Sequence, residues 1–85
     1  MKDGRVREAI ERLLDARPAG SSICPSEVAR DLESEEDAWR ALMPEVRRVA
    51  AMMAGEGALQ ATRAGKVIDA EAPGGPIRLR RPAGP

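Results

Sequence analysis

The last third of the chain carries the pattern that most restricts the fold. Apolar and polar residues alternate over 58–62 and again over 77–81, as is typical of strands that bury one face. Arginine occupies polar positions of the second segment. We expect 58–62 to pair with 77–81 as a hairpin, with the residues between them forming its tip. A tighter hairpin that pairs 59–62 with 66–69 is the alternative register.

A first helix is predicted near the start of the chain. Apolar residues recur at the spacing of one helix face from Val6 to Leu14, with charged residues between them. Pro18 and Gly20 follow and favour an end to the helix. The pattern therefore predicts a helix over about 5–16.

Several features agree on the start of a second helix. Pro25 suits the first helical position, because the N–H that proline lacks would be unpaired there. Cys24 then becomes the N-cap, and the Glu27 carboxylate can accept a hydrogen bond from its backbone N–H. Ile23 and Val28 occupy the two positions of a hydrophobic staple, and we expect Ile23 to lie in a short β segment. The helix itself is predicted over 25–32.

A third helix is predicted after the acidic turn at 33–37, with Gly55 and Gly57 ending it. At about 100° per residue, one face of this helix is apolar. That face consists of Leu42, Val46, Val49, Ala50 and Met53. Pro44 is the exception, since a proline inside a helix costs about 3 kcal/mol. We expect either a break with a restart at Pro44 or a kink there.

The composition fits one small domain and argues against several classes of protein. Trp39 is the only aromatic residue, so we expect it to be the one large ring of an aliphatic core. There is no histidine and a single cysteine, which leaves no metal-ligand set and no internal disulfide. No phosphate-binding glycine loop and no apolar run of membrane-spanning length occur. We expect a cytoplasmic protein that is not an enzyme, with no cofactor, no small-molecule substrate and no membrane partner.

Three helices followed by a C-terminal hairpin is the order of elements in a winged helix. This is an α+β fold in which a three-helix bundle is closed by a two-stranded β-hairpin, the wing. We expect a single winged-helix domain over 1–82 and a loose tail over 83–85.

Four segments of the sequence carry a resemblance, at 23–29, 39–47, 62–65 and 75–81. They are similar to a family of small, uncharacterised bacterial proteins with a predicted winged helix-turn-helix fold. The resemblance implies the fold but no activity. More broadly, the chain resembles winged helix-turn-helix regulators, in which the third helix enters the major groove of DNA.

Basic residues gather in the second half of the chain and predict contact with phosphates. Residues 1–43 carry a formal charge of −3 and residues 44–85 a charge of +3. The basic residues are Arg63, Lys66, Arg78, Arg80 and Arg81 on the hairpin, and Arg40, Arg47 and Arg48 on the polar face of the third helix. The alternative is that they only keep an exposed strand and a helix face in water. We expect a nucleic-acid-binding module that binds duplex DNA through its basic wing, with low sequence specificity.

Acidic residues argue against docking by the start of the third helix. Four carboxylates stand there and would meet phosphates with like charge, which favours docking by the wing. They are Glu33, Glu35, Glu36 and Asp37. The alternative function is a protein-interaction or dimerisation module that binds no DNA. Trp39, Met43 and Met52 would then form the contact surface, because tryptophan can anchor a partner and methionine can adapt to one.

Overall fold

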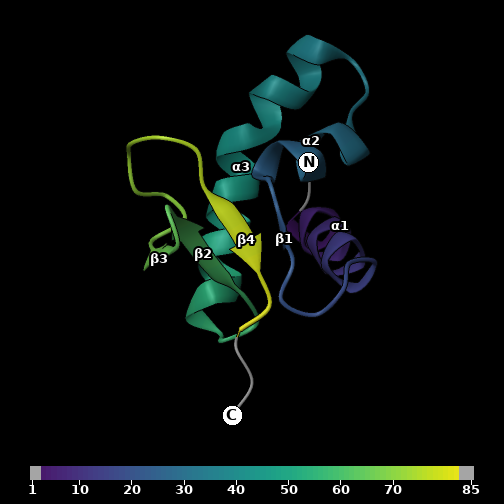
Figure 1. Cartoon of the computed structure of the whole chain (residues 1–85). Helices are drawn as coiled ribbons and strands as arrows, with labels where there is room; N and C mark the ends of the chain where they lie inside the picture. The colour runs from purple at the N-terminus through teal and green to yellow at the C-terminus, as the bar shows by residue number, and fades with distance from the viewer. Residues whose placement is uncertain (1–2, 83–85) are drawn as a thin grey trace.

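The chain folds into three α-helices and a four-stranded antiparallel sheet, which confirms the predicted α+β class (Figure 1). The computed structural model describes residues 3–82, so the tail predicted at 83–85 lies outside the described residues. In chain order the elements are α1 (Asp3–Asp15), β1 (Ser22–Ile23), α2 (Pro25–Leu32), α3 (Glu36–Gly55), β2 (Gln60–Arg63), β3 (Lys66–Ile68) and β4 (Arg78–Arg80).

The first two helices begin close to their predicted positions. α1 starts at Asp3, slightly before the predicted start, and ends at Asp15. α2 has the predicted bounds, with Pro25 in its first turn. The Cys24 N–H donates to Oε2 of Glu27 over 2.7 Å, which confirms the predicted cap. Local sequence signals are therefore sufficient to place this helix.

α3 runs without interruption through Pro44, so the predicted restart of the helix at this residue is wrong. Proline has no N–H, and the carbonyl of Arg40 therefore lacks the donor that residue 44 would normally supply. The apolar face holds the helix together across this defect, since all five residues predicted to lie on it are buried. Burial of that face outweighs the local cost of the proline.

The sheet has the strand order β1-β4-β2-β3, so the predicted two-stranded hairpin is incomplete. β2 pairs with β3 on one side and with β4 on the other, which means that both expected pairings occur together. Each is shifted by one residue from the predicted ends, because Ala61 lies opposite Leu79 and Ile68. The turn between β2 and β3 consists of Ala64 and Gly65, whose φ values of 52° and 82° suit a type I′ hairpin.

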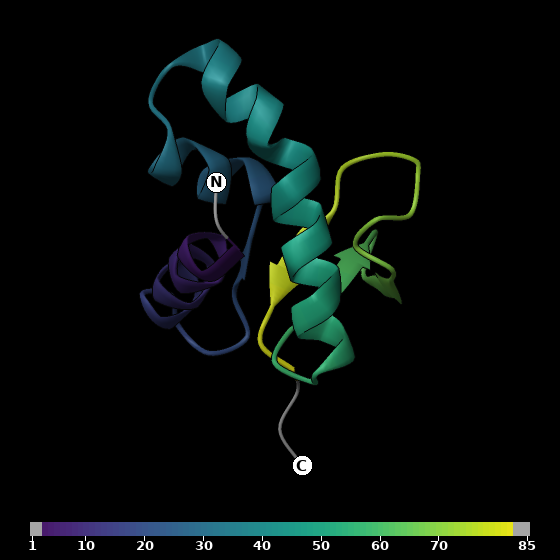
Figure 2. The same ribbon diagram turned by 180° about the vertical axis from the view of Figure 1, so that it is seen from behind.

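One face of the sheet is covered and the other is bare. α3 lies behind the sheet in Figure 1 and in front of it in Figure 2, whereas no helix of residues 3–82 crosses the opposite face. Ile23, Ala61 and Leu79 are fully buried on the covered face. Trp39 is only half-buried and packs against the core from its margin, so the core itself is wholly aliphatic. These features are compatible with the predicted winged helix.

We predict that Pro44→Ala will stabilise the protein, because it restores the hydrogen bond to the Arg40 carbonyl and removes the ring from the helix interior. The free energy of unfolding should rise by about 1–3 kcal/mol. Urea denaturation followed by circular dichroism measures this change. Pro76→Ala, in an exposed loop, is the control and should give no gain. A loss of stability in Pro44→Ala would contradict the argument.

Candidate nucleic-acid interface

Six arginines are paired with carboxylates of the same chain, so their charges are largely compensated. The nitrogen–oxygen distances of these pairs lie between 2.5 and 3.6 Å. The pairs are Arg7–Glu56, Arg12–Asp31, Arg17–Glu27, Arg40–Glu36, Arg48–Asp3 and Arg81 with both Glu11 and Asp15.

Two of the predicted phosphate contacts, Arg48 and Arg81, turn toward α1. Arg48 donates to both carboxylate oxygens of Asp3, over 2.6 and 3.0 Å, and this hydrogen bonding lowers the pKa of Asp3. Nη2 of Arg81 lies 2.7 Å from Oε2 of Glu11 and 2.5 Å from Oδ1 of Asp15. These arginines fasten α3 and the end of β4 to α1, so the structure does not bring them to the candidate interface.

The other basic residues of the sheet keep their charge, because their partners are neutral. Arg78 donates to the hydroxyl and the carbonyl of Ser22, each over 2.9 Å. Nε of Arg80 donates to the side-chain carbonyl of Gln60 over 3.1 Å. Lys66 is exposed and has no hydrogen bond or ion pair to any residue in 3–82. Neutral partners fix the positions of Arg78 and Arg80 without cancelling their positive charge.

Arg63 holds the long loop between β3 and β4 rather than facing outward. Its guanidinium donates to three backbone carbonyls, those of Ala72, Pro73 and Gly75, each over 3.1 Å. The backbone of Gly74 passes so close that a Cβ there would lie 2.8 Å from Nη1 of Arg63. Glycine is favoured at this position chiefly by its φ of +134°, because the end of the Arg63 side chain could shift to make room for a Cβ. Arg63 contributes charge to the wing, but its nitrogens are already bound within the chain.

Arg78 and Arg80 project from the bare face of the sheet, opposite α3. Leu79 lies between them and is fully buried, and successive side chains of a strand point to opposite faces. The pairing register places further side chains on the bare face. These are Ser22, Gln60, Thr62 and Val67. Val67 is 59% exposed, Ser22 and Gln60 are half-buried, and Thr62 is buried with 5% of its surface exposed.

Arg40 and Arg47 lie on a different surface of the molecule. Together with Met43 and Pro44 of α3 and Glu71 of the β3–β4 loop, they line an open cleft. α3 packs on the covered face of the sheet, so this cleft and the bare face are separate surfaces. The predicted phosphate contacts are therefore divided between several places. Arg78 and Arg80 remain on the bare face of the sheet, whereas exposed Lys66 pairs with Arg63, in register with Ala61 and Ile68, and so lies on the α3 side at the tip of the β2–β3 hairpin.

Trp39 is flanked by two guanidinium groups, as cation–π pairs require. The Cζ atom of Arg30 lies 4.5 Å from the ring centroid, and that of Arg40 lies 5.4 Å from it. Arg30 belongs to α2, whereas Trp39 and Arg40 belong to α3. The stack links the two helices, which gives Trp39 a structural role in addition to any role in binding.

The predicted contact surface of Trp39, Met43 and Met52 does not form one patch. Met43 is half-buried at the cleft beside Arg47. Met52 is 44% exposed, and its sulfur lies 3.8 Å from Nη1 of Arg48, which faces α1. The two methionines therefore lie on different sides of α3, and a single partner surface cannot use both at its centre.

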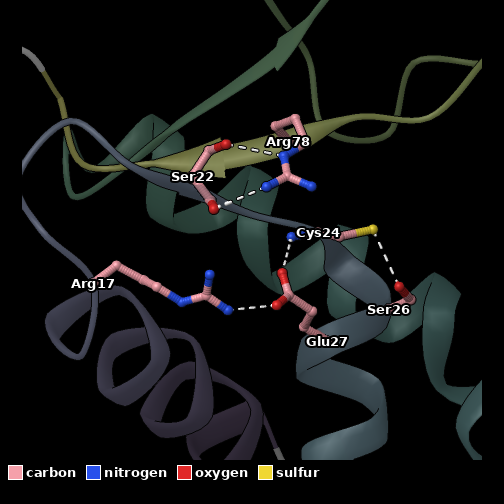
Figure 3. Close-up of polar contacts among 6 residues, drawn as sticks. All are labelled: Arg17, Ser22, Cys24, Ser26, Glu27 and Arg78. Carbon is pink, nitrogen blue, oxygen red and sulfur yellow. Dashed lines mark hydrogen bonds and ion pairs between the residues drawn. The ribbon is translucent and has the colours of Figure 1, made fainter.

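A polar network anchors β1 and the start of α2 beneath the basic sheet (Figure 3). The Glu27 carboxylate accepts hydrogen bonds from the Cys24 N–H and from Arg17. These bonds, the backbone one foremost, and the nearby charge of Arg78 hold the pKa of Glu27 below its ordinary value near 4.5. Ser22, which binds Arg78, lies on the same short strand. The network positions the arginine at the β1 edge of the bare face.

Sequence reasoning missed the acceptors Ser22 and Gln60 as well as Arg30 and Glu71. Ser22 meets Arg78 only because β1 pairs with β4 across most of the chain. One local signal for Ser22 was present in the sequence. Ile23 is predicted to be in a β conformation, so alternation places the side chain of its neighbour Ser22 on the opposite face of the strand.

The described residues offer no sign of a metal centre or a membrane span. No three metal-ligand side chains come together within residues 3–82. No helix of that region combines the length and apolar character that crossing a membrane requires.

The comparison with protein families covers nearly the whole fold. The model of a family described as a protein of unknown function (DUF3253) matches residues 3–82, and the chain therefore belongs to this family. No curated protein matches the sequence. The matched region includes every helix and strand of the structure, but the family has no known function, so the match assigns no activity to the chain.

We predict that Arg63→Lys will loosen the loop at 69–77, because an ammonium group cannot hold three carbonyls in the planar fork of a guanidinium. Losing two hydrogen bonds, at about 0.5–1.5 kcal/mol each, should speed amide hydrogen exchange in the loop about fivefold or more. Arg80→Lys, which changes a single neutral contact, is the control. Unchanged exchange of the loop amides in Arg63→Lys would refute this role.

We predict that Glu27 stabilises the fold only above acidic pH. A carboxyl whose folded pKa is lowered contributes stability above its unfolded pKa, near 4.5, and loses it as the pH falls through the folded pKa. Glu27→Gln should therefore cost about 1 kcal/mol or less at neutral pH, with the difference vanishing in acid. Urea denaturation between pH 2 and 7 tests this, with exposed Glu8→Gln as the control. A constant difference across that range would contradict the prediction.

Proposed function

We propose that this member of the DUF3253 family is a winged-helix module that binds nucleic acid, with duplex DNA as its partner. The observation that carries the proposal is the charge of the sheet. Strands β2, β3 and β4 hold four basic residues and no acidic one. None of these four forms an ion pair with a carboxylate of residues 3–82, although the charge of Arg78 acts on the nearby Glu27 carboxylate and lowers its pKa. They are Arg63, Lys66, Arg78 and Arg80.

Three of these residues can still donate to phosphate oxygens. The hydrogen bonds of Arg78 and Arg80 to neutral oxygens leave other guanidinium N–H groups unused, and Lys66 stands exposed at the start of β3. Arginines already oriented by their partners lose less conformational freedom on binding. Arg78 and Arg80 on the bare face, together with Lys66 at the tip of the hairpin, support a small electrostatic footprint for a phosphate backbone.

The charges on α3 favour contact through the sheet rather than through this helix. Arg48 is bound to Asp3, and Arg40 lies 3.6 Å from Glu36. The predicted acidic start of the helix is exposed at Glu35, Glu36 and Asp37. A phosphate backbone approaching this end of the molecule would meet like charge, so we propose docking by the wing.

The test is a titration of labelled random duplex DNA, followed by fluorescence anisotropy at several salt concentrations. Three phosphate contacts predict micromolar or weaker affinity and a log–log salt slope of about −2.7. The double variant Lys66→Ala/Arg80→Ala should reduce the slope to about −0.9 and weaken binding at low salt. Arg5→Ala, which removes an exposed arginine of α1, is the control and should leave the slope unchanged.

Two outcomes would overturn the proposal. One is absence of binding at low salt, which would leave the predicted protein-interaction module as the working hypothesis. The other is equal loss of affinity in Arg5→Ala and in the sheet variant, since binding would then follow total charge rather than the sheet.

A further inference from the structure

The cleft beside α3 has the size and the lining of a small-molecule site. Its volume is about 470 Å³, and its lining residues are Arg40, Met43, Pro44, Arg47 and Glu71. Ligand sites are typically about 300–1,000 Å³, with an apolar surface and a few placed polar groups. The lining residues belong to α3 and, in the case of Glu71, to the β3–β4 loop. Figure 2 shows the ribbons of these two segments from the side of the helix.

The helix wall supplies two cations on either side of an apolar floor. Arg47 is half-buried and has no hydrogen bond or ion pair to any residue in the described range 3–82. Arg40 has a long, exposed contact to Glu36 and lies over the Trp39 ring, with its Cζ atom 5.4 Å from the ring centroid. The two arginines are separated by about 10.5 Å along the helix axis, with Met43 and Pro44 between them. This side of the cleft can receive an anionic group next to an apolar body.

The cleft also contains hydrogen-bond acceptors, which a site for a simple anion would not need. Glu71 lines the opposite wall and forms no ion pair within residues 3–82, although its charge acts on the Arg48 guanidinium and helps to raise the pKa of that group. Pro44 leaves the Arg40 carbonyl without its helical donor. A ligand with a negative charge and an N–H group would match both walls of the cleft. Its charge would pair with the arginines of the helix wall, and its N–H would donate to Glu71 on the loop wall.

The loop wall is held in place before any ligand binds. Arg63 binds three of its carbonyls, as described above. Ala70 is fully buried in the core, and Oδ1 of Asp69 accepts a hydrogen bond from the Glu71 N–H over 2.8 Å. These contacts fix the backbone of Glu71 relative to α3. A preformed wall lowers the entropic cost of binding.

We infer that this cleft binds a small organic anion with an apolar body and an N–H donor. Its phosphate or carboxylate pairs with Arg47 and Arg40, its body packs on Met43 and Pro44, and its N–H donates to Glu71. The site uses no residue of the bare sheet face. The inference is therefore independent of the proposed binding of nucleic acid.

The experiment is a titration of the ¹⁵N-labelled chain, followed by two-dimensional NMR, with two classes of probe. Adenosine and cytidine 5′-monophosphate supply a phosphate, and indole-3-acetate supplies a carboxylate; all three carry N–H donors on a ring. Inorganic phosphate tests the anion alone. Saturable shifts confined to 40–47 and 69–75 with at least one organic probe are expected, and the arm that binds identifies the anionic group.

Two variants separate the proposed site from simple attraction of anions. Arg47→Ala should weaken binding about tenfold or more, whereas Arg5→Ala should leave it unchanged. Glu71→Gln removes a negative charge, so it would strengthen binding of a simple anion. It should instead weaken the proposed ligand several-fold, because the charged acceptor of its N–H is lost. The spectra show directly whether each variant is folded.

The inference is overturned by any of three results. These are the absence of saturable shifts with all organic probes, equal affinity for inorganic phosphate and the organic probes, or tighter organic binding in Glu71→Gln.

Discussion

The position of β4 between β1 and β2 is the constraint on which the rest of the structure depends. This strand brings Leu79 into the core opposite Ile23 and Ala61, and all three are fully buried. The core contains no aromatic ring, so its stability comes from close packing of small aliphatic side chains. The same strand turns Arg78 and Arg80 outward. One short segment thus closes the core and sets the charge of the bare face.

The sequence predicts those features that depend on neighbouring residues. The start of α2 follows from Cys24, Pro25 and Glu27, which lie within one turn, and the structure has the expected cap. The strands of the hairpin follow from the alternation of apolar and polar residues, although β2 pairs with both β3 and β4 rather than with one of them. What could not be predicted depends on distant contacts. Arg81 binds α1, and Arg63 binds the loop that follows β3, because the fold places acceptors there that no local pattern reveals.

Arginine serves two purposes in this chain, and the partner decides which. Arg12 and Arg48 bind carboxylates and join helices, whereas Arg78 and Arg80 bind neutral oxygens and keep their charge. Sequence position alone does not separate the two groups, since Arg80 and Arg81 are adjacent and belong to different ones. The formal net charge is zero, but positive charge is therefore distributed unevenly over the surface of the protein. The candidate interface arises from this division rather than from an excess of basic residues.

The pairing of Ser22 with Arg80 also determines when the fold can form. These partners are separated by most of the sequence. The entropic cost of closing so long a loop must therefore be met before the contact can stabilise the fold. Helices α1 to α3 precede β4 in the chain and pack chiefly on one another. β1 and β2, in contrast, have no strand between them until β4 is in place, so the sheet and the part of the core that it covers are completed late in folding.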